Sequence, residues 1–333
     1  MGKPLCPFQT LPGHWVSDMG TVGITALVPP ELVYGCGQTP FDLNNTVPTS
    51  ECIPRGKLCA WTATWRDALL HGEIRVDSLV VVAGGDCHNA LVDGQRVAMK
   101  GIPTHYLFYP FDGNEGEMED HLATLEAFLG GITDQAALNM IADVKDLCIK
   151  LDVARCRRQI LGSRVFNHLI QLCDLGGDPE RFGTSVRKAL EDRPPDIPDI
   201  RIALVGVPPI YPDFHQVCEG FGMQVVFDEL PWEFARMGGR TLRTMARNYA
   251  GYTFARDLEY RFKMLERELG RRRVEGVVHY TQYACHHVLE DDMIRERLDL
   301  PMLTIQGDLA RKCPEQERLR LEAFAELLEG GDG

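Results

Sequence analysis

Short, unbroken runs of apolar residues alternate with longer helical patterns along this chain. Leu-Val-Val-Val-Ala at 79–83 and Gly-Val-Val at 276–278 show no apolar–polar alternation, as expected of strands buried on both faces. Strands separated by helices form βαβ units with right-handed crossovers, and these build a parallel sheet. The pattern therefore predicts an α/β fold made of Rossmann-like parallel sheets.

Two stretches of the chain repeat the same order of features. Each has a β-branched run ending in Cys-His, then a proline before a second apolar run, then Leu-Glu-Ala-Phe in an acidic helical pattern. These landmarks are Cys87, Pro103 and 125–128 in the first stretch, and Cys285, Pro301 and 321–324 in the second. The shared order predicts two similar halves, and a similar order without duplication is the alternative.

The repeat divides the chain into three parts. We expect a first α/β domain at 1–131, a helical region with a linker at 132–199, and a second α/β domain at 200–333. The middle part shows apolar residues at helical spacing. Its end, Asp-Arg-Pro-Pro-Asp-Ile-Pro-Asp at 192–199, cannot be helical, because proline lacks the N–H group and clashes with the preceding turn.

Charge and hydropathy exclude several classes of function. The net charge of −13 argues against a nucleic-acid-binding protein, because phosphate contacts need clustered Lys and Arg. The longest basic run, Arg271-Arg272-Arg273, is typical of a solvated helix end. No apolar run reaches the roughly 18–20 residues that span a bilayer, and the first residues lack the apolar core of a signal peptide. We therefore expect a cytoplasmic protein that binds neither nucleic acid nor membranes.

Eleven cysteines are many for a chain in a reducing compartment, where they act as buried thiols, ligands or redox groups. Cys87 and Cys285 each follow a strand and precede a helix, so both should project into the crevice at the carboxyl ends of the strands. The helix N-termini there stabilise thiolates. A cluster or metal site is therefore expected between the halves, although adjacent Cys-His pairs do not match the usual zinc spacing.

The other cysteines differ in what their sequence context predicts. Spacing alone leaves Cys36, Cys52 and Cys59 open as a third ligand. The remainder are expected to be buried apolar residues (Cys148, Cys156, Cys173, Cys218) or incidental (Cys6, Cys313).

The C-terminal half carries a recognisable series of motifs. A strand leads to Cys285, with Glu290 five residues on, then Leu-Pro-Met-Leu and an acidic turn at 300–308, and then Arg-Leu-Glu-Ala-Phe-Ala-Glu within 316–328. This series resembles the 2-hydroxyacyl-CoA dehydratase and benzoyl-CoA reductase subunit family. Residues 30–40 are similar to an early helix-turn-strand of the family, and the resemblance extends over residues 22–328.

The resemblance implies a cofactor and a reaction. It places a [4Fe-4S] cluster on Cys59, Cys87 and Cys285 and leaves the fourth iron open to a substrate thioester. A double-cubane cluster needs further cysteines in the second half and is less favoured. The implied reaction is a radical dehydration of a 2-hydroxyacyl-CoA, started by one low-potential electron, in an oxygen-sensitive lyase. A benzoyl-CoA reductase-like subunit, a non-catalytic cluster-holding or electron-transfer subunit, and a cluster-free remnant are the alternatives.

The resemblance also implies partners and candidate catalytic residues. We expect a homologous subunit, in a homodimer or heterodimer, and a separate ATP-driven activator, because this chain has no Gly-x-x-x-x-Gly-Lys-Ser/Thr motif. The substrate is an acyl-CoA or a related small molecule, although no clear CoA-binding signature is present. Glu290 could instead point along its helix toward solvent. The candidate catalytic residues are His286, Glu290 and Asn45, with Asn44, His88 and His287 near the same cleft.

Overall fold

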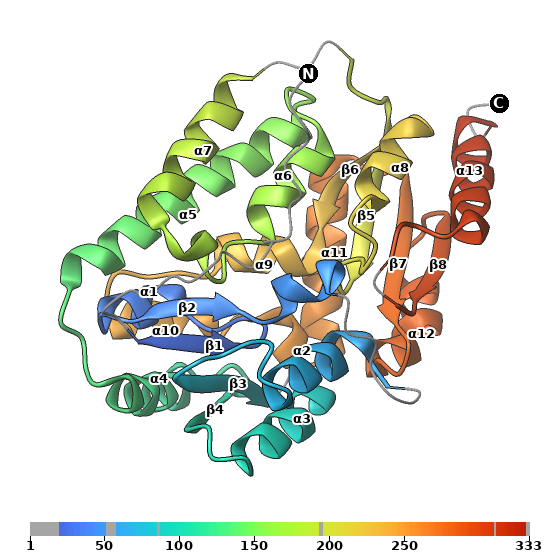
Figure 1. Cartoon of the computed structure of the whole chain (residues 1–333). Helices are drawn as coiled ribbons and strands as arrows, with labels where there is room; N and C mark the ends of the chain where they lie inside the picture. Colours follow the sequence, from blue (N-terminus) through green and yellow to red (C-terminus); the bar gives the residue numbers. More distant parts are fainter. Residues whose placement is uncertain (1–19, 51–57, 85–86, 193–195, 310, 331–333) are drawn as a thin grey trace.

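The chain folds around two separate four-stranded parallel sheets, shown in Figure 1. The computed structural model describes residues 20–50, 58–84, 87–192, 196–309 and 311–330. The first sheet has the order β2-β1-β3-β4 and the second has the order β6-β5-β7-β8. The strands are β1 Thr21–Ile24, β2 Thr39–Asp42, β3 Ser78–Gly84, β4 Thr104–Phe108, β5 Ile200–Gly206, β6 Met223–Asp228, β7 Gly276–Gln282 and β8 Met302–Gly307. The predicted fold class is confirmed.

The two sheets repeat one topology. The third strand of each, β3 or β7, lies next to the first and leads directly to the Cys-His pair, at Cys87 or Cys285. The fourth strand of each follows a proline and is followed by a helix carrying Leu-Glu-Ala-Phe. The order of landmarks in the sequence therefore corresponds to equivalent places in the two sheets.

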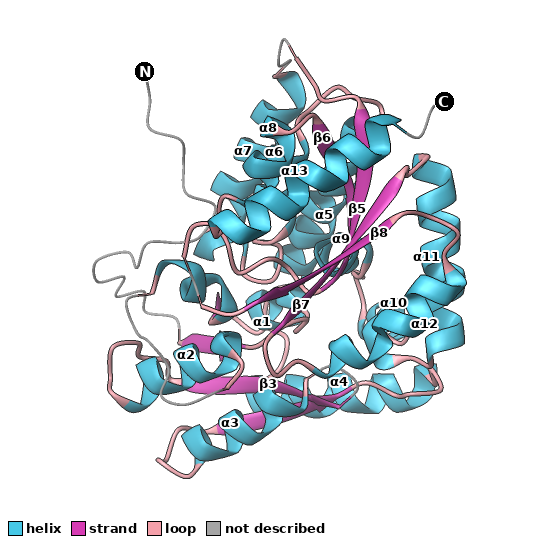
Figure 2. Cartoon of the chain, turned by 90° about the vertical axis from the view of Figure 1, so that its right-hand side faces the viewer, coloured by secondary structure: helices cyan, strands magenta, loops and turns pink. Residues whose placement is uncertain are grey.

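Helices cover the sheets and make up the region between them in sequence (Figures 1 and 2). No helix in the described ranges combines the length and apolar character needed to cross a bilayer. The α-helices are α1 Pro30–Gly35, α2 Ala60–Leu70, α3 His88–Ala98, α4 Glu115–Leu129, α5 Gln135–Cys156, α6 Gly162–Leu169, α7 Pro179–Glu191, α8 Phe214–Gly220, α9 Glu229–Arg236, α10 Leu242–Tyr249, α11 Leu258–Arg272, α12 Asp291–Arg297 and α13 Glu315–Gly330. The 3-10 helices are η1 Asn44–Thr49, η2 Leu175–Gly177, η3 Thr253–Ala255 and η4 His286–Glu290.

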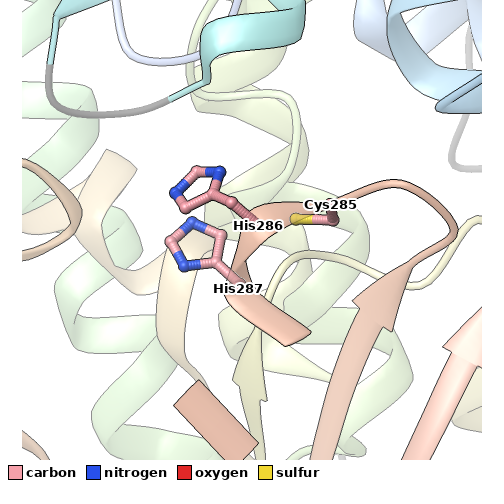
Figure 3. A group of neighbouring side chains, drawn as sticks. All are labelled: Cys285, His286 and His287. Carbon is pink, nitrogen blue, oxygen red and sulfur yellow. The ribbon is translucent and has the colours of Figure 1, made fainter. Parts of the chain in front are cut away.

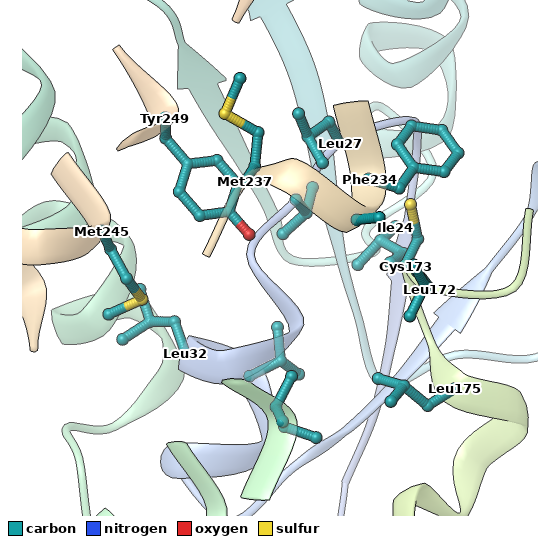
Figure 4. Packing of buried hydrophobic residues seen from close by; sticks show 14 of the residues in the cluster. Ile24, Leu27, Leu32, Leu172, Cys173, Leu175, Phe234, Met237, Met245 and Tyr249 are labelled. Carbon is teal, nitrogen blue, oxygen red and sulfur yellow. The ribbon is translucent and has the colours of Figure 1, made fainter. Parts of the chain in front are cut away.

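Buried side chains from all three parts of the chain share one core. Figure 4 shows Ile24 from the first sheet beside Cys173 from the helical region and Phe234 from α9. A second buried cluster joins Trp65 of α2 to Tyr280 of β7, so the two halves also pack directly on each other. This packing fixes the relative position of the two sheets, and the domain boundaries expected from the sequence stay a prediction.

The basic run at the end of α11 is only partly solvated. Arg271 is half exposed, but Arg272 is 1% exposed. The Arg272 guanidinium donates to Asp152 at 2.6 Å and to the carbonyl oxygen of Val226 at 2.6 Å. The prediction of a solvated helix end is therefore wrong for Arg272, because the buried face of the helix continues through that position.

Candidate functional site

A cavity of about 100 Å³ lies between the two halves. It is reached from the carboxyl ends of strands in both sheets, where parallel α/β sheets bind their ligands. Residues from the first half include Thr25, Asp42, Asn44, Asn45, Cys59, Trp61 and Cys87, and residues from the second half include Val207, Pro208, Gln282, Cys285, His286 and His287. The cavity brings together the three predicted cluster cysteines with Asn45 and His286, whereas Glu290 and His88 are not part of its lining.

Cys59 and Cys87 occupy matching local positions at the N-termini of helices α2 and α3. The Sγ atom of Cys87 accepts the backbone N–H of Ala90 at 3.4 Å. Cys59 is 6% exposed, and burial raises the pKa of its thiol, while the backbone N–H groups of Thr62 and Trp61 favour the thiolate. Thiols that face the N–H donors of a helix N-terminus are readily held as thiolates when a bound cation balances their charge.

Cys285 reaches the cavity from the turn after β7. Ala284 before it has a left-handed backbone, with φ of 62°, and Cys285 caps the N-terminus of η4. The side-chain amide of Asn89 in α3 donates to the carbonyl oxygen of Ala284 at 3.0 Å. This bond ties the Cys-His turn of the first half to that of the second, next to the cavity.

Two imidazoles stand beside the Cys285 thiol, as Figure 3 shows. One ligand atom from each of Cys285, His286 and His287 lies within 4.8 Å of the other two. The rings of His286 and His287 have centroids 4.1 Å apart. Partial burial of its ring, with His287 adjacent, lowers the pKa of His286 to about 4, so this imidazole is neutral and can donate or accept a hydrogen bond.

Glu290 is turned back toward the site rather than toward solvent. Its carboxylate lies 3.0 Å from Nδ1 of His287 and forms an ion pair with the buried Arg261 of α11. Burial opposes ionisation of Glu290, but His287 and Arg261 together lower its pKa to about 2. The possibility that it faces solvent is wrong, because η4 has three residues per turn and therefore stacks positions 287 and 290.

Asp42 is a cavity residue that sequence reasoning missed. It ends β2, is 2% exposed, and its backbone N–H donates to the carboxylate of Asp174 at 2.9 Å. Burial and the charge of Asp174 raise the pKa of Asp42 well above its usual value, and burial raises the pKa of Asp174 to about 6. The repeated Phe-Asp pairs at 41–42 and 227–228 were the signal that could have found it.

The remaining cysteines lie away from the cavity or outside the described residues. Cys36 is buried at the end of α1 and does not line the cavity. Cys156 is only partly buried, contrary to expectation, and its Sγ accepts a hydrogen bond from the Arg272 guanidinium at 3.0 Å. Cys148, Cys173 and Cys218 are buried as predicted, Cys313 is also buried, and Cys6 and Cys52 lie outside the described residues.

One further feature bears on what the cavity can hold. The indole N–H of Trp61, which also lines the cavity, is buried and has no hydrogen-bond partner among the described residues. A buried donor without an acceptor indicates that an acceptor is supplied by something bound there.

Comparison with known proteins agrees with this architecture. The model of a protein family described as 2-hydroxyglutaryl-CoA dehydratase, D-component, matches residues 25–328. The chain belongs to this family. The match covers the second sheet, every strand of the first sheet except β1, the helical region and every residue named at the cavity. The family predicted from the sequence is therefore confirmed, and a role as a dehydratase component is supported. No curated protein matches the chain.

Proposed function

We propose that this dehydratase-family chain is an iron–sulfur subunit that holds a [4Fe-4S] cluster through Cys59, Cys87 and Cys285. One observation carries the proposal: these thiols, distant in sequence, line the same interdomain cavity. Two of them occupy equivalent places in the repeated fold, and all three stand at helix N-termini. Thiolates are the usual ligands of iron–sulfur clusters, and helix N-termini stabilise them.

One side chain beside the thiols favours a cluster over a single zinc ion. The buried Trp61 indole N–H lines the cavity and has no acceptor among the described residues. The sulfur atoms of an iron–sulfur cluster accept hydrogen bonds, whereas a zinc ion offers no acceptor. The Cys285-His286-His287 set is the competing zinc site, and metal analysis distinguishes the two.

The chain's own side chains would bind and orient the substrate. When bound, the cluster would supply an iron with one open position for a thioester oxygen and would transfer single electrons. Leu230 and Phe234 form an apolar wall that limits water in the cavity. Asn45, fixed by its hydrogen bond to the carbonyl oxygen of Ile170 at 3.1 Å, and the neutral His286 are placed to contact a polar substrate group. Glu290 does not line the cavity and acts indirectly, by holding the His287 ring in place.

The proposed reaction is a lyase reaction, the radical dehydration of a 2-hydroxyacyl-CoA thioester. The family's own description, a D-component, supports a further subunit beside this one. We propose a homologous subunit and an ATP-driven one-electron donor as partners, since the sequence contains no phosphate-binding loop motif. An oxygen-sensitive cluster of this kind suits the cytoplasm of an anaerobic cell.

Anaerobic purification followed by iron and sulfide analysis tests the proposal. We expect a brown protein with about four irons per chain. Cys87→Ser and Cys285→Ser should lose the iron and colour, and Cys59→Ser should lose most of both. Cys173→Ser and Cys36→Ser are matched controls, because both thiols are buried but neither lines the cavity.

Three results would contradict the proposal. One zinc per chain would favour the Cys285-His286-His287 site, and a colourless, metal-free protein would favour a cluster-free remnant. Equal iron loss in Cys173→Ser would show that general destabilisation, and not ligation, explains the loss. Turnover of 2-hydroxyglutaryl-CoA with an ATP-driven activator would then separate a dehydratase from a reductase-like subunit or an electron carrier.

A further inference from the structure

The repeat places one aspartate at the end of the second strand of each half, and the two aspartates have opposite surroundings. Asp42 ends β2 and Asp228 ends β6, which are equivalent edge strands of the two sheets. Both are almost fully buried, with 2% and 1% exposure. Asp42 lines the interdomain cavity, whereas Asp228 does not.

Asp228 has an arginine as its cationic partner. It forms an ion pair with Arg155 and lies 2.7 Å from Nε2 of His215. Burial alone would favour its neutral form, but these two partners lower its pKa. Asp228 is therefore a charged structural group that joins β6 to α5 and α8.

Asp42 has a buried carboxylate nearby and no cationic partner among the described residues, whereas Asp228 pairs with an arginine. Its backbone N–H donates to Asp174, and its own Oδ1 accepts the N–H of Asn44 at 2.9 Å. Among the described residues, no Lys, Arg or His forms an ion pair with Asp42. Ionising two buried carboxyl groups without a cation beside them has a large free-energy cost, so the pair retains a proton near neutral pH.

The groups around this pair do not supply the missing positive charge. The thiol of Cys173 lies beside Asp42 and is itself buried. Lys145 of α5, whose charge favours the Cys173 thiolate, is paired with Glu31 at 2.8 Å. The surroundings of Asp42 therefore keep a proton on a carboxyl that faces the cavity.

We propose that Asp42 is the proton donor of the site, delivering its proton to the hydroxyl oxygen that leaves the substrate. This inference rests on the proposed dehydratase function. In the step, the carbon–oxygen bond of the one-electron-reduced thioester breaks, and the electron pair leaves with the oxygen. The Asp42 O–H proton passes to that oxygen, and the products are water and the Asp42 carboxylate. The carboxylate regains a proton when the adjacent substrate carbon loses one. The product radical anion then returns its extra electron to the one-electron donor, so the sum is loss of water.

Infrared spectroscopy of the anaerobically purified protein tests for the stored proton without turnover. The wild type near neutral pH should show a carboxylic-acid C=O band that Asp42→Asn removes. Asp228→Asn, the equivalent substitution in the other half, should leave the band in place. A band that persists in Asp42→Asn, or no band in the wild type, would overturn the inference whether or not a substrate is turned over.

Kinetics with 2-hydroxyglutaryl-CoA and an ATP-driven activator test the use of the proton. Asp42→Asn should lower kcat by about 100-fold or more, the usual effect of losing a general acid, with iron content and KM unchanged. Asp42→Glu should restore part of the rate. Loss of iron in Asp42→Asn would show a structural role instead, and unchanged kcat would refute proton donation. A wild type without iron would refute the proposed function itself, and this outcome is distinguishable from a failure of proton donation by Asp42.

Discussion

Arg272 and Arg271 are neighbours at the end of α11, and their burial predicts different effects of the same substitution. Arg272 is 1% exposed and donates two bonds to Asp152, at 2.6 and 3.1 Å, and one to the carbonyl oxygen of Val226. Arg271 is half exposed, and in the described part of the chain its hydrogen bonds and ion pair go to Glu268. Replacing each in turn by methionine removes the charge but keeps most of the aliphatic stem.

The expected magnitudes follow from what each change leaves behind. Removing one partner of a buried ion pair costs about 3–5 kcal/mol, because the other charge stays buried. Asp152 keeps Arg155 at 2.7 Å, so Arg272→Met should fall near the lower limit, about 3 kcal/mol. Arg271→Met should cost no more than about 1 kcal/mol, because the Arg271 guanidinium is half exposed and the buried Glu268 keeps Arg267 and Arg272, each at 3.4 Å.

Urea unfolding of the two variants, followed by circular dichroism at neutral pH, measures the difference. The total free energy of unfolding of a domain is about 5–15 kcal/mol, so a loss of about 3 is easily resolved from one below 1. Similar small shifts in both midpoints would refute the assignment of a buried, structural Arg272. Similar large shifts in both unfolding midpoints would show that the difference in burial between Arg271 and Arg272 does not determine the loss of stability.

Three further changes have defined outcomes. The folded pKa of Asp174, about 6, lies above its usual 3.8, so the wild type should lose up to about 3 kcal/mol of stability as the pH rises through this range. In urea unfolding, Asp174→Asn should be more stable than the wild type above about pH 6 and as stable as the wild type below about pH 4. Glu290→Gln leaves buried Arg261 with one carboxylate fewer and should cost about 1.5–3 kcal/mol in the same assay. Gly206→Ala puts a Cβ 2.3 Å from the carbonyl oxygen of Tyr280 at a φ of +99°, and should cost at least about 2 kcal/mol and reduce iron loading, measured by urea unfolding and iron analysis.

The repeat made part of the site predictable. A strand followed by Cys-His occurs twice, and a parallel sheet sends both turns to its carboxyl edge, so Cys87 and Cys285 could be placed without a structure. Cys59 has no equivalent in the second half, and its prediction depended on family resemblance. Its position at the start of α2, facing the same cavity, became visible only in the folded chain.

Side-chain environments were harder to predict than positions. Phe262, Leu265, Leu269 and Arg272 share one face of α11, and that spacing was available in the sequence. The charge of arginine argued against burial of position 272 more strongly than the spacing argued for it, because a guanidinium is usually solvated unless a buried carboxylate pairs with it. That carboxylate, Asp152, comes from a helix 120 residues earlier.

The sequence by itself determined the two parallel sheets, their common order and the family, because these depend on local patterns and on motifs read along the chain. Only the tertiary structure decided the surroundings of the aspartates that end β2 and β6. Asp42 and Asp228 hold the same place in the repeat, yet Asp42 has a carboxylate bonded to its backbone N–H and no ion pair among the described residues, whereas Asp228 pairs with an arginine and a histidine. Long-range packing supplies those partners, and a buried group's ionisation is set by its partners.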